Sequence, residues 1–75
     1  MILNEDKEKN IKLYKYIEQQ RKEKKITYEN ISDLLGLRVS TVFAKFKKLS
    51  IGKSVKTEFL FQLEKILDIK IFFDF

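Results

Sequence analysis

The sequence lacks cysteine and histidine altogether, and it also contains no proline. Without cysteine the chain has no disulfide framework and no thiolate site for a metal ion. Without histidine it has neither the usual zinc ligand nor the commonest general base. Serine and aspartate are present, but no histidine or activated lysine joins them in a catalytic pattern. We therefore expect a protein that is not an enzyme and that needs no metal or other cofactor.

Long hydrophobic runs are also missing. The first segment, MILNEDKEKN, carries charged side chains at Glu5 and Asp6, a pattern that excludes a secretory leader. No later run approaches the roughly 20 apolar residues of a membrane span. With no proline, repeat or low-complexity linker to divide it, the 75-residue chain is expected to form one domain over residues 1–75. These absences predict a cytoplasmic protein with no membrane partner.

Positive charge is concentrated in one third of the chain. The sequence has 16 basic and 11 acidic residues, but residues 34–57 contain six basic residues and no acidic one. The other 51 of the 75 residues hold the remaining 10 basic and all 11 acidic residues, so the positive excess lies within that segment. Such a field suits a polyanion such as nucleic acid, and a lysine-rich solvated surface is the alternative. The six basic residues are Arg38, Lys45, Lys47, Lys48, Lys53 and Lys56.

Apolar residues recur at spacings of three and four in four segments, which is the pattern of amphipathic helices. Thr27 followed by Asn30 predicts a capped helix start, because the amide of Asn30 can take the part of the Glu or Gln in a capping box. Gly36 predicts the end of that helix, and Ser54 or Thr57 is expected to cap the last one. We expect helices over about 5–24, 27–35, 39–48 and 55–67. The expected core residues are Leu13, Ile17, Ile31, Leu34, Leu35, Val42, Phe46, Leu49, Leu60, Leu63 and Leu67.

The last residues, IKIFFDF, change to the two-residue period of a strand. We expect a short strand over about 69–74, so that the fold is mainly α: a small four-helix domain with one C-terminal β-strand. A lone apolar strand needs a partner, and the simplest is its own copy in a homodimer. The alternative is a tail that folds back on its own helices. The residues expected at the dimer contact are Ile69, Lys70, Ile71, Phe72, Phe73 and Asp74.

The segment TYENISDLLGLRVSTVFAKFKKL resembles the helix-turn-helix of the Cro-like and phage-repressor (XRE-type) family. Ser32 stands at the place of its small first-helix residue, Gly36 at the turn glycine, Leu37 at the apolar residue after it, and Val42 at the buried residue of the second helix. The resemblance extends over residues 13–73. It implies a small dimeric regulator of transcription, of the phage or plasmid repressor type, that binds double-stranded DNA through the second helix of the motif.

The resemblance, together with the outer face expected for the second helix, indicates which residues meet DNA. Polar and basic side chains there suit phosphates and base edges, whereas Phe43 and Ala44 occupy the centre, where Arg, Asn or Gln usually reads bases. Family members often pair a first-helix Arg with a recognition-helix Glu; Arg21 matches the former, but Phe46 replaces the latter. The expected DNA contacts are Arg38, Ser40, Thr41, Phe43, Ala44, Lys47, Lys48 and Lys53.

Phe43 also leaves two other interpretations open. An exposed phenylalanine is a typical anchor for a protein contact. The same scaffold could then serve as a protein-interaction module, such as an antitoxin or a phage-encoded inhibitor of a host nucleoprotein machine. Alternatively, Phe43 could bury against the loop near Ile51 and have no binding role.

Overall fold

The computed structural model describes residues 4–71. In this part of the chain the secondary structure consists of helices, and no β-strand is formed. The predicted mainly helical, four-helix architecture is therefore confirmed. The helices are α1 (Asn4–Glu23), α2 (Tyr28–Leu35), α3 (Val39–Ser50) and α4 (Thr57–Leu67). None of the helices in the described range combines the length and the apolar character that are needed to cross a membrane.

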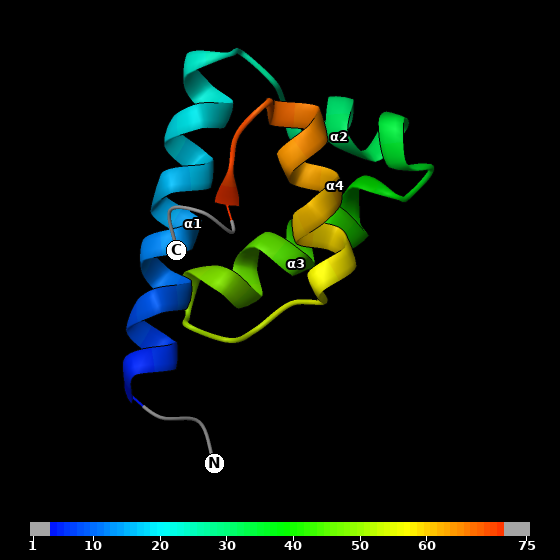
Figure 1. The fold of residues 1–75 in the computed structure, drawn as a ribbon. Helices are drawn as coiled ribbons and strands as arrows, with labels where there is room; N and C mark the ends of the chain where they lie inside the picture. The colour runs from blue at the N-terminus through cyan, green and yellow to red at the C-terminus, as the bar shows by residue number, and fades with distance from the viewer. Residues whose placement is uncertain (1–3, 72–75) are drawn as a thin grey trace.

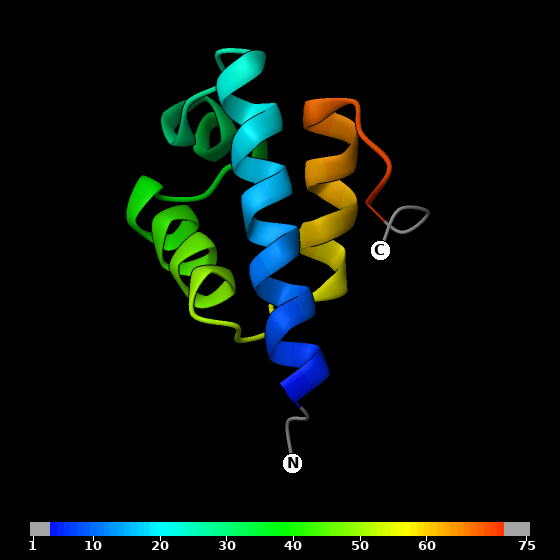
Figure 2. The same ribbon diagram turned by 90° about the vertical axis from the view of Figure 1, so that its left-hand side faces the viewer.

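Among the four helices, α3 is the one with substantial contacts to two others. Figure 1 shows α1 and α4 running in the same direction, with α3 crossing at the level of the lower half of α1. After a turn of 90°, α2 and α3 lie on one side of α1 and α4, whereas residues 68–71 lie on the other (Figure 2). Because α3 packs against both α1 and α2, its inner side is fixed by two helices.

The start of α2 has the predicted capping box. The Thr27 hydroxyl accepts a hydrogen bond from the Asn30 backbone N–H at 3.1 Å, and the Asn30 side chain accepts one from the Thr27 N–H at 3.0 Å. Gly36 ends the helix in the left-handed conformation, at φ +66°. Both local predictions are confirmed, because the groups involved lie within four residues of each other and depend little on the rest of the fold.

The junction between α3 and α4 differs from the prediction. α3 continues past Lys48 to Ser50, whose hydroxyl donates to the Lys47 carbonyl at 2.6 Å. α4 begins at Thr57 with Lys56 at its N-cap, and no side chain caps it. Ser54 instead accepts a hydrogen bond from the Asn10 side chain at 3.2 Å. The predicted Ser54 or Thr57 cap is therefore wrong, because the N-cap residue is Lys56, whose side chain has no oxygen to accept a hydrogen bond from the first turn.

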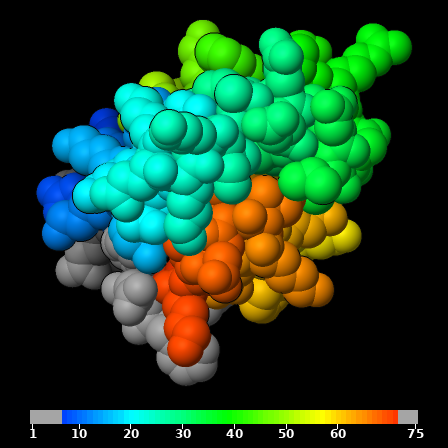
Figure 3. All heavy atoms as spheres, turned by 90° about the horizontal axis from the view of Figure 1, so that it is seen from above, coloured from blue at the N-terminus to red at the C-terminus, as the bar shows by residue number. Residues whose placement is uncertain are grey.

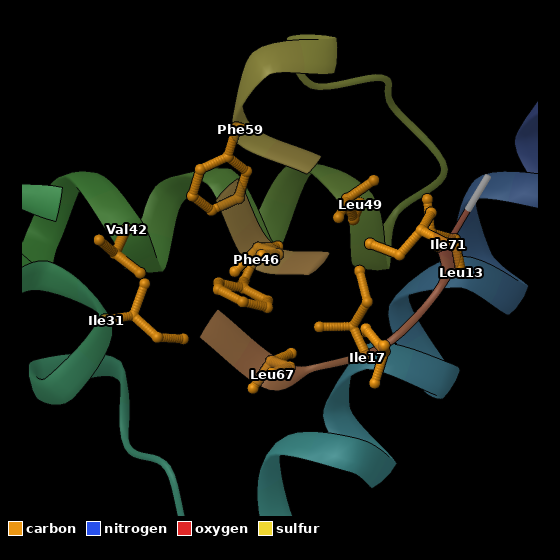
Figure 4. Packing of buried hydrophobic residues seen from close by; sticks show 11 residues of the cluster. Leu13, Ile17, Ile31, Val42, Phe46, Leu49, Phe59, Leu67 and Ile71 are labelled. Carbon is orange, nitrogen blue, oxygen red and sulfur yellow. The ribbon is translucent and has the colours of Figure 1, made fainter. Parts of the chain in front are cut away.

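Phe46 occupies the centre of the core. Its ring centroid lies 5.8 Å from that of Phe59 and 4.7 Å from that of Tyr28. One core prediction is wrong: Leu34 is 67% exposed, and on α2 Ser32 takes the inward position. On α4 Phe59 is buried, and Leu60, like Leu35 on α2, is half-buried against the core. The buried cluster, most of it labelled in Figure 4, comprises Leu13, Ile17, Ile31, Val42, Phe46, Leu49, Phe59, Leu63, Leu67, Ile69 and Ile71.

Residues 68–71 turn back onto the helices of their own chain. Lys24 donates to the backbone carbonyls of Leu67 and Asp68, and this joins the end of α1 to the end of α4 (Figure 3). Ile69 and Ile71 are buried, whereas Lys70 between them is exposed. The predicted alternation is therefore present over residues 69–71, but no strand is formed there. Phe72, Phe73 and Asp74 lie outside the described residues.

Candidate nucleic-acid interface

The outer face of α3 is open to solvent. Val42, Phe46 and Leu49 bury one side of the helix. At about 100° per residue, the opposite side carries Ser40, Ala44 and Lys47. All eight residues predicted to contact DNA are exposed, and the structure places six of them on α3, one just before it and one just after it. They are Arg38, Ser40, Thr41, Phe43, Ala44, Lys47, Lys48 and Lys53.

The electrostatics of α3 favour an anion along its whole length. Arg38 is the N-cap residue, no side chain caps the first turn, and no acidic residue lies in that turn. The positive end of the helix dipole is therefore not neutralised locally. Lys47 and Lys48 lie in the last turn. Lys45 differs, because it is half-buried and its ammonium lies 5.3 Å from the centroid of the Phe59 ring, on the side of α4.

Phe43 lies on the flank of this face that is turned toward α2. Its side chain is 58% exposed, so burial against the loop near Ile51 is wrong; Ile51 is itself 51% exposed. The ring instead meets Tyr28 edge-on, with 5.0 Å between ring centroids and 64° between ring planes. No pattern in the sequence indicates this contact, because the two residues lie 15 positions apart on different helices.

Behind Phe43, Tyr28 is held by charged groups of α1. The Tyr28 hydroxyl donates to one carboxylate oxygen of Glu18, and the other oxygen accepts from Arg21 Nε at 2.5 Å. The Arg21 guanidinium covers the Tyr28 ring, 4.3 Å from its centroid, and donates to the Ile26 carbonyl at 2.9 Å. Arg21 therefore has its partner within α1. The i,i+3 spacing of Glu18 and Arg21 was a readable signal for this pair.

Both tyrosines near Glu18 are shifted toward the neutral form. Burial raises the pKa of Tyr28, and the hydrogen bond to the Glu18 carboxylate and its negative charge raise it further. The pKa of Tyr14 is raised in the same direction, again mainly by burial and then by the charge of Glu18. An ionised phenol beside this carboxylate is disfavoured, so the network behind Phe43 requires protonated tyrosine.

The raised tyrosine pKa predicts a loss of stability in alkali. A group whose pKa is higher in the folded than in the unfolded chain contributes stability below its ordinary value, here about 10, and loses it as the pH rises further. We expect the free energy of unfolding to fall more steeply above about pH 10 in the natural protein than in Tyr28→Phe. Urea denaturation at several alkaline pH values measures both slopes. Equal slopes would contradict the assigned role of Tyr28.

The predicted dimer residues do not join this surface. Ile69 and Ile71 are buried in the core, and Figure 2 shows residues 68–71 beyond α4, away from α2. Within residues 4–71, no group of three acidic side chains is placed to hold a metal ion. The exposed residues of α3 are thus the best-defined candidate surface in the described part of the chain.

Ser32 and Val42 are buried, and Gly36 has a left-handed backbone conformation. The resemblance has no support from outside the sequence: a scan of protein-family models, a search of curated proteins and a search of solved structures each found no match.

Proposed function

We propose that the protein is a small dimeric regulator of transcription that binds specific DNA sequences, a repressor of the phage or plasmid type. The observation that carries the proposal is the open, acid-free outer face of α3. Every residue predicted to contact DNA is exposed there or beside it, and residues 34–57 contain no acidic side chain. A polyanion that approaches this face meets no acidic residue on α3 itself.

The dimensions of α3 suit the major groove of DNA. Twelve residues make a helix of about 18 Å, and the groove is about 12 Å wide. With α1 and α2 behind it, α3 can enter the groove with Ser40, Ala44 and Lys47 toward the bases. Arg38 at one end and Lys48 at the other are then placed for the phosphates on either side.

Selection from random duplexes tests this function. The full chain is incubated with double-stranded DNA of random sequence, and the bound fraction is amplified and sequenced. A dimer with one α3 per half-site is expected to enrich a palindrome whose half-sites lie about one helical turn apart, roughly 34 Å. Failure to enrich any sequence, together with no binding at low salt, would contradict the proposal.

Salt dependence is expected to identify the residues that contact phosphates. The logarithm of affinity should fall with the logarithm of salt concentration by about 0.9 per neutralised phosphate. Lys47→Ala and Lys48→Ala should each reduce that slope by about one unit. Lys65→Ala is the matched control, because Lys65 is exposed but lies on α4, and its slope should not change. Equal slopes in all four proteins would leave the basic face as a solvated surface only.

The dimer in this proposal uses the tail. In an antiparallel ribbon centred on Phe72, Lys70 faces the Asp74 of a second copy, and Ile71 faces its Phe73. The burial of Ile69 and Ile71 with Lys70 exposed supports this arrangement, because it turns the apolar side of the tail toward the helices and leaves the Lys70 side outward. Each facing pair contributes a few tenths to about 1 kcal/mol.

Removing residues 72–75 is expected to convert the dimer into a folded monomer. The truncation spares Ile71, which belongs to the core; a longer deletion would remove it and unfold the domain as well. Sedimentation gives the mass, and circular dichroism shows that the helices remain. A truncated chain that is still a folded dimer rules out the ribbon.

A protein-interaction module is the second candidate. It is favoured by exposed apolar side chains on either side of the turn between α2 and α3. Leu34 is 67% exposed, and Leu37, Val39 and Phe43 are also exposed. Apolar residues of this kind are typical anchors of protein contacts. Under this alternative, Phe43→Ala abolishes capture of a protein partner, while the protein has no measurable affinity for duplex DNA.

A further inference from the structure

If α3 recognises bases, it must do so without the bidentate hydrogen bonds that are most common in DNA-binding proteins. Bidentate hydrogen bonds from Arg, Asn or Gln usually identify guanine and adenine, and α3 contains none of these residues. Ser40 and Lys47 are the polar residues at the centre of its outer face. Ala44 lies between them, and Phe43 lies on the flank of the face. The largest side chain offered to the groove is therefore an aromatic ring. In the major groove, the matching chemical group is the 5-methyl of thymine, the only apolar substituent that the four bases present there.

We propose that Phe43 is a specificity-determining residue that contacts a thymine methyl group, and that Tyr28 is the positioning residue that fixes its ring. This inference rests on the proposed DNA-binding function and adds the chemical class of base that the site selects. Phe43 qualifies because its side chain is 58% exposed and lies on the flank of the outer face of α3.

The position of the Phe43 ring is restricted before DNA arrives. An exposed phenylalanine normally loses rotational freedom on binding, and that loss weakens the contact. Here the edge-on contact with Tyr28, 5.0 Å between centroids, confines the ring on one side. Tyr28 is itself confined by Glu18 at its hydroxyl and by Arg21 over its ring. A network in α1 thus supports a residue of α3 through a side chain of α2.

Uracil substitution isolates the methyl group. Uracil pairs as thymine does and differs only by lacking the 5-methyl, so each thymine of the selected duplex can be replaced in turn. Burying one methyl changes affinity by about fourfold. At one position per half-site, we expect uracil to weaken binding of the natural protein by about fourfold, and by about fifteenfold when both half-sites are changed.

The variants assign this preference to residues. Phe43→Ala should bind thymine and uracil duplexes equally, whereas Phe43→Leu should keep part of the preference. Val39→Ala is the matched control, since Val39 is another exposed apolar residue of α3, and it should keep the full preference at that position. Tyr28→Phe keeps a ring but releases the Glu18 contact; it should reduce the preference without changing the salt slope. Circular dichroism verifies the fold of each variant.

The outcomes separate this inference from the function on which it rests. Sequence-specific binding with equal affinity for thymine and uracil at every position overturns the inference and leaves DNA binding intact. A preference that survives in Phe43→Ala but is lost in Val39→Ala overturns it as well. Absence of binding to any duplex contradicts the proposed function, and the inference falls with it.

Discussion

Phe46→Ala is expected to lower the free energy of unfolding by about 3 to 5 kcal/mol, the usual loss for a truncated buried phenylalanine. Phe46 is 1% exposed and contacts the rings of both Tyr28 and Phe59. A domain of this size has a total stability of about 4 to 11 kcal/mol. The substitution therefore removes a large part of it, and the variant is expected to be partly unfolded at growth temperature.

Phe43→Ala is the matched comparison, because it removes the same side chain three positions earlier on the same helix. Phe43 is mostly exposed and loses one ring contact, with Tyr28, so the expected cost is about 1 kcal/mol or less. Urea denaturation followed by circular dichroism measures both. Similar losses for the two variants would mean that Phe43 belongs to the core and is not available for binding.

Gly52→Ala is expected to be the most damaging of the small substitutions. Gly52 is buried and has φ +87°, a conformation that costs other residues about 1 to 2 kcal/mol. A methyl group there would also lie 3.2 Å from the Cβ and the backbone oxygen of Lys7, and closer still to its Cγ. The first turns of α1 would have to move away, breaking the bond from Asn10 to the Gly52 carbonyl. A total loss of about 2 to 4 kcal/mol is expected.

Gly36→Ala separates the cost of the backbone conformation from the cost of the clash with α1. Gly36 has a similar conformation, at φ +66°, but nothing lies within 4 Å of the position of the added methyl. Only the backbone cost of about 1 kcal/mol should remain. Thermal unfolding of the two variants side by side gives the difference. If Gly36→Ala proves as destabilising as Gly52→Ala, contact between the loop and α1 is not what requires glycine at position 52.

Features determined by neighbouring residues were predictable from the sequence. The capping box of Thr27 and Asn30 and the glycine that ends α2 follow from groups a few residues apart. The buried stripe of α3 follows from the helical period, and that stripe fixes which residues of α3 face outward. The exposure of the six candidate DNA contacts on α3 was predictable for the same reason.

Features determined by distant residues were not predictable. Leu34 and Leu35 have the same hydrophobicity, and only the position of α2 against its neighbours decides which of them is exposed. The Ser54 hydroxyl, which was predicted to cap α4, accepts a hydrogen bond from Asn10, 44 residues away. Tyr28 and Glu18 support Phe43 through contacts between three helices. The pattern of residues within one helix does not indicate which side chains of the other helices it will meet.

The core places the earliest and latest parts of the described chain together. Leu13 and Ile17 of α1 lie beside Leu49 and Ile71 (Figure 4), and α1 has its main helix contacts with α3. During synthesis α1 therefore leaves the ribosome well before the residues that will cover it. At about 5 to 20 residues per second, it waits roughly 2 to 10 seconds between the synthesis of its own last turn and that of Ile71. The apolar side of α1 therefore has no complete set of partners until synthesis of the chain is nearly finished.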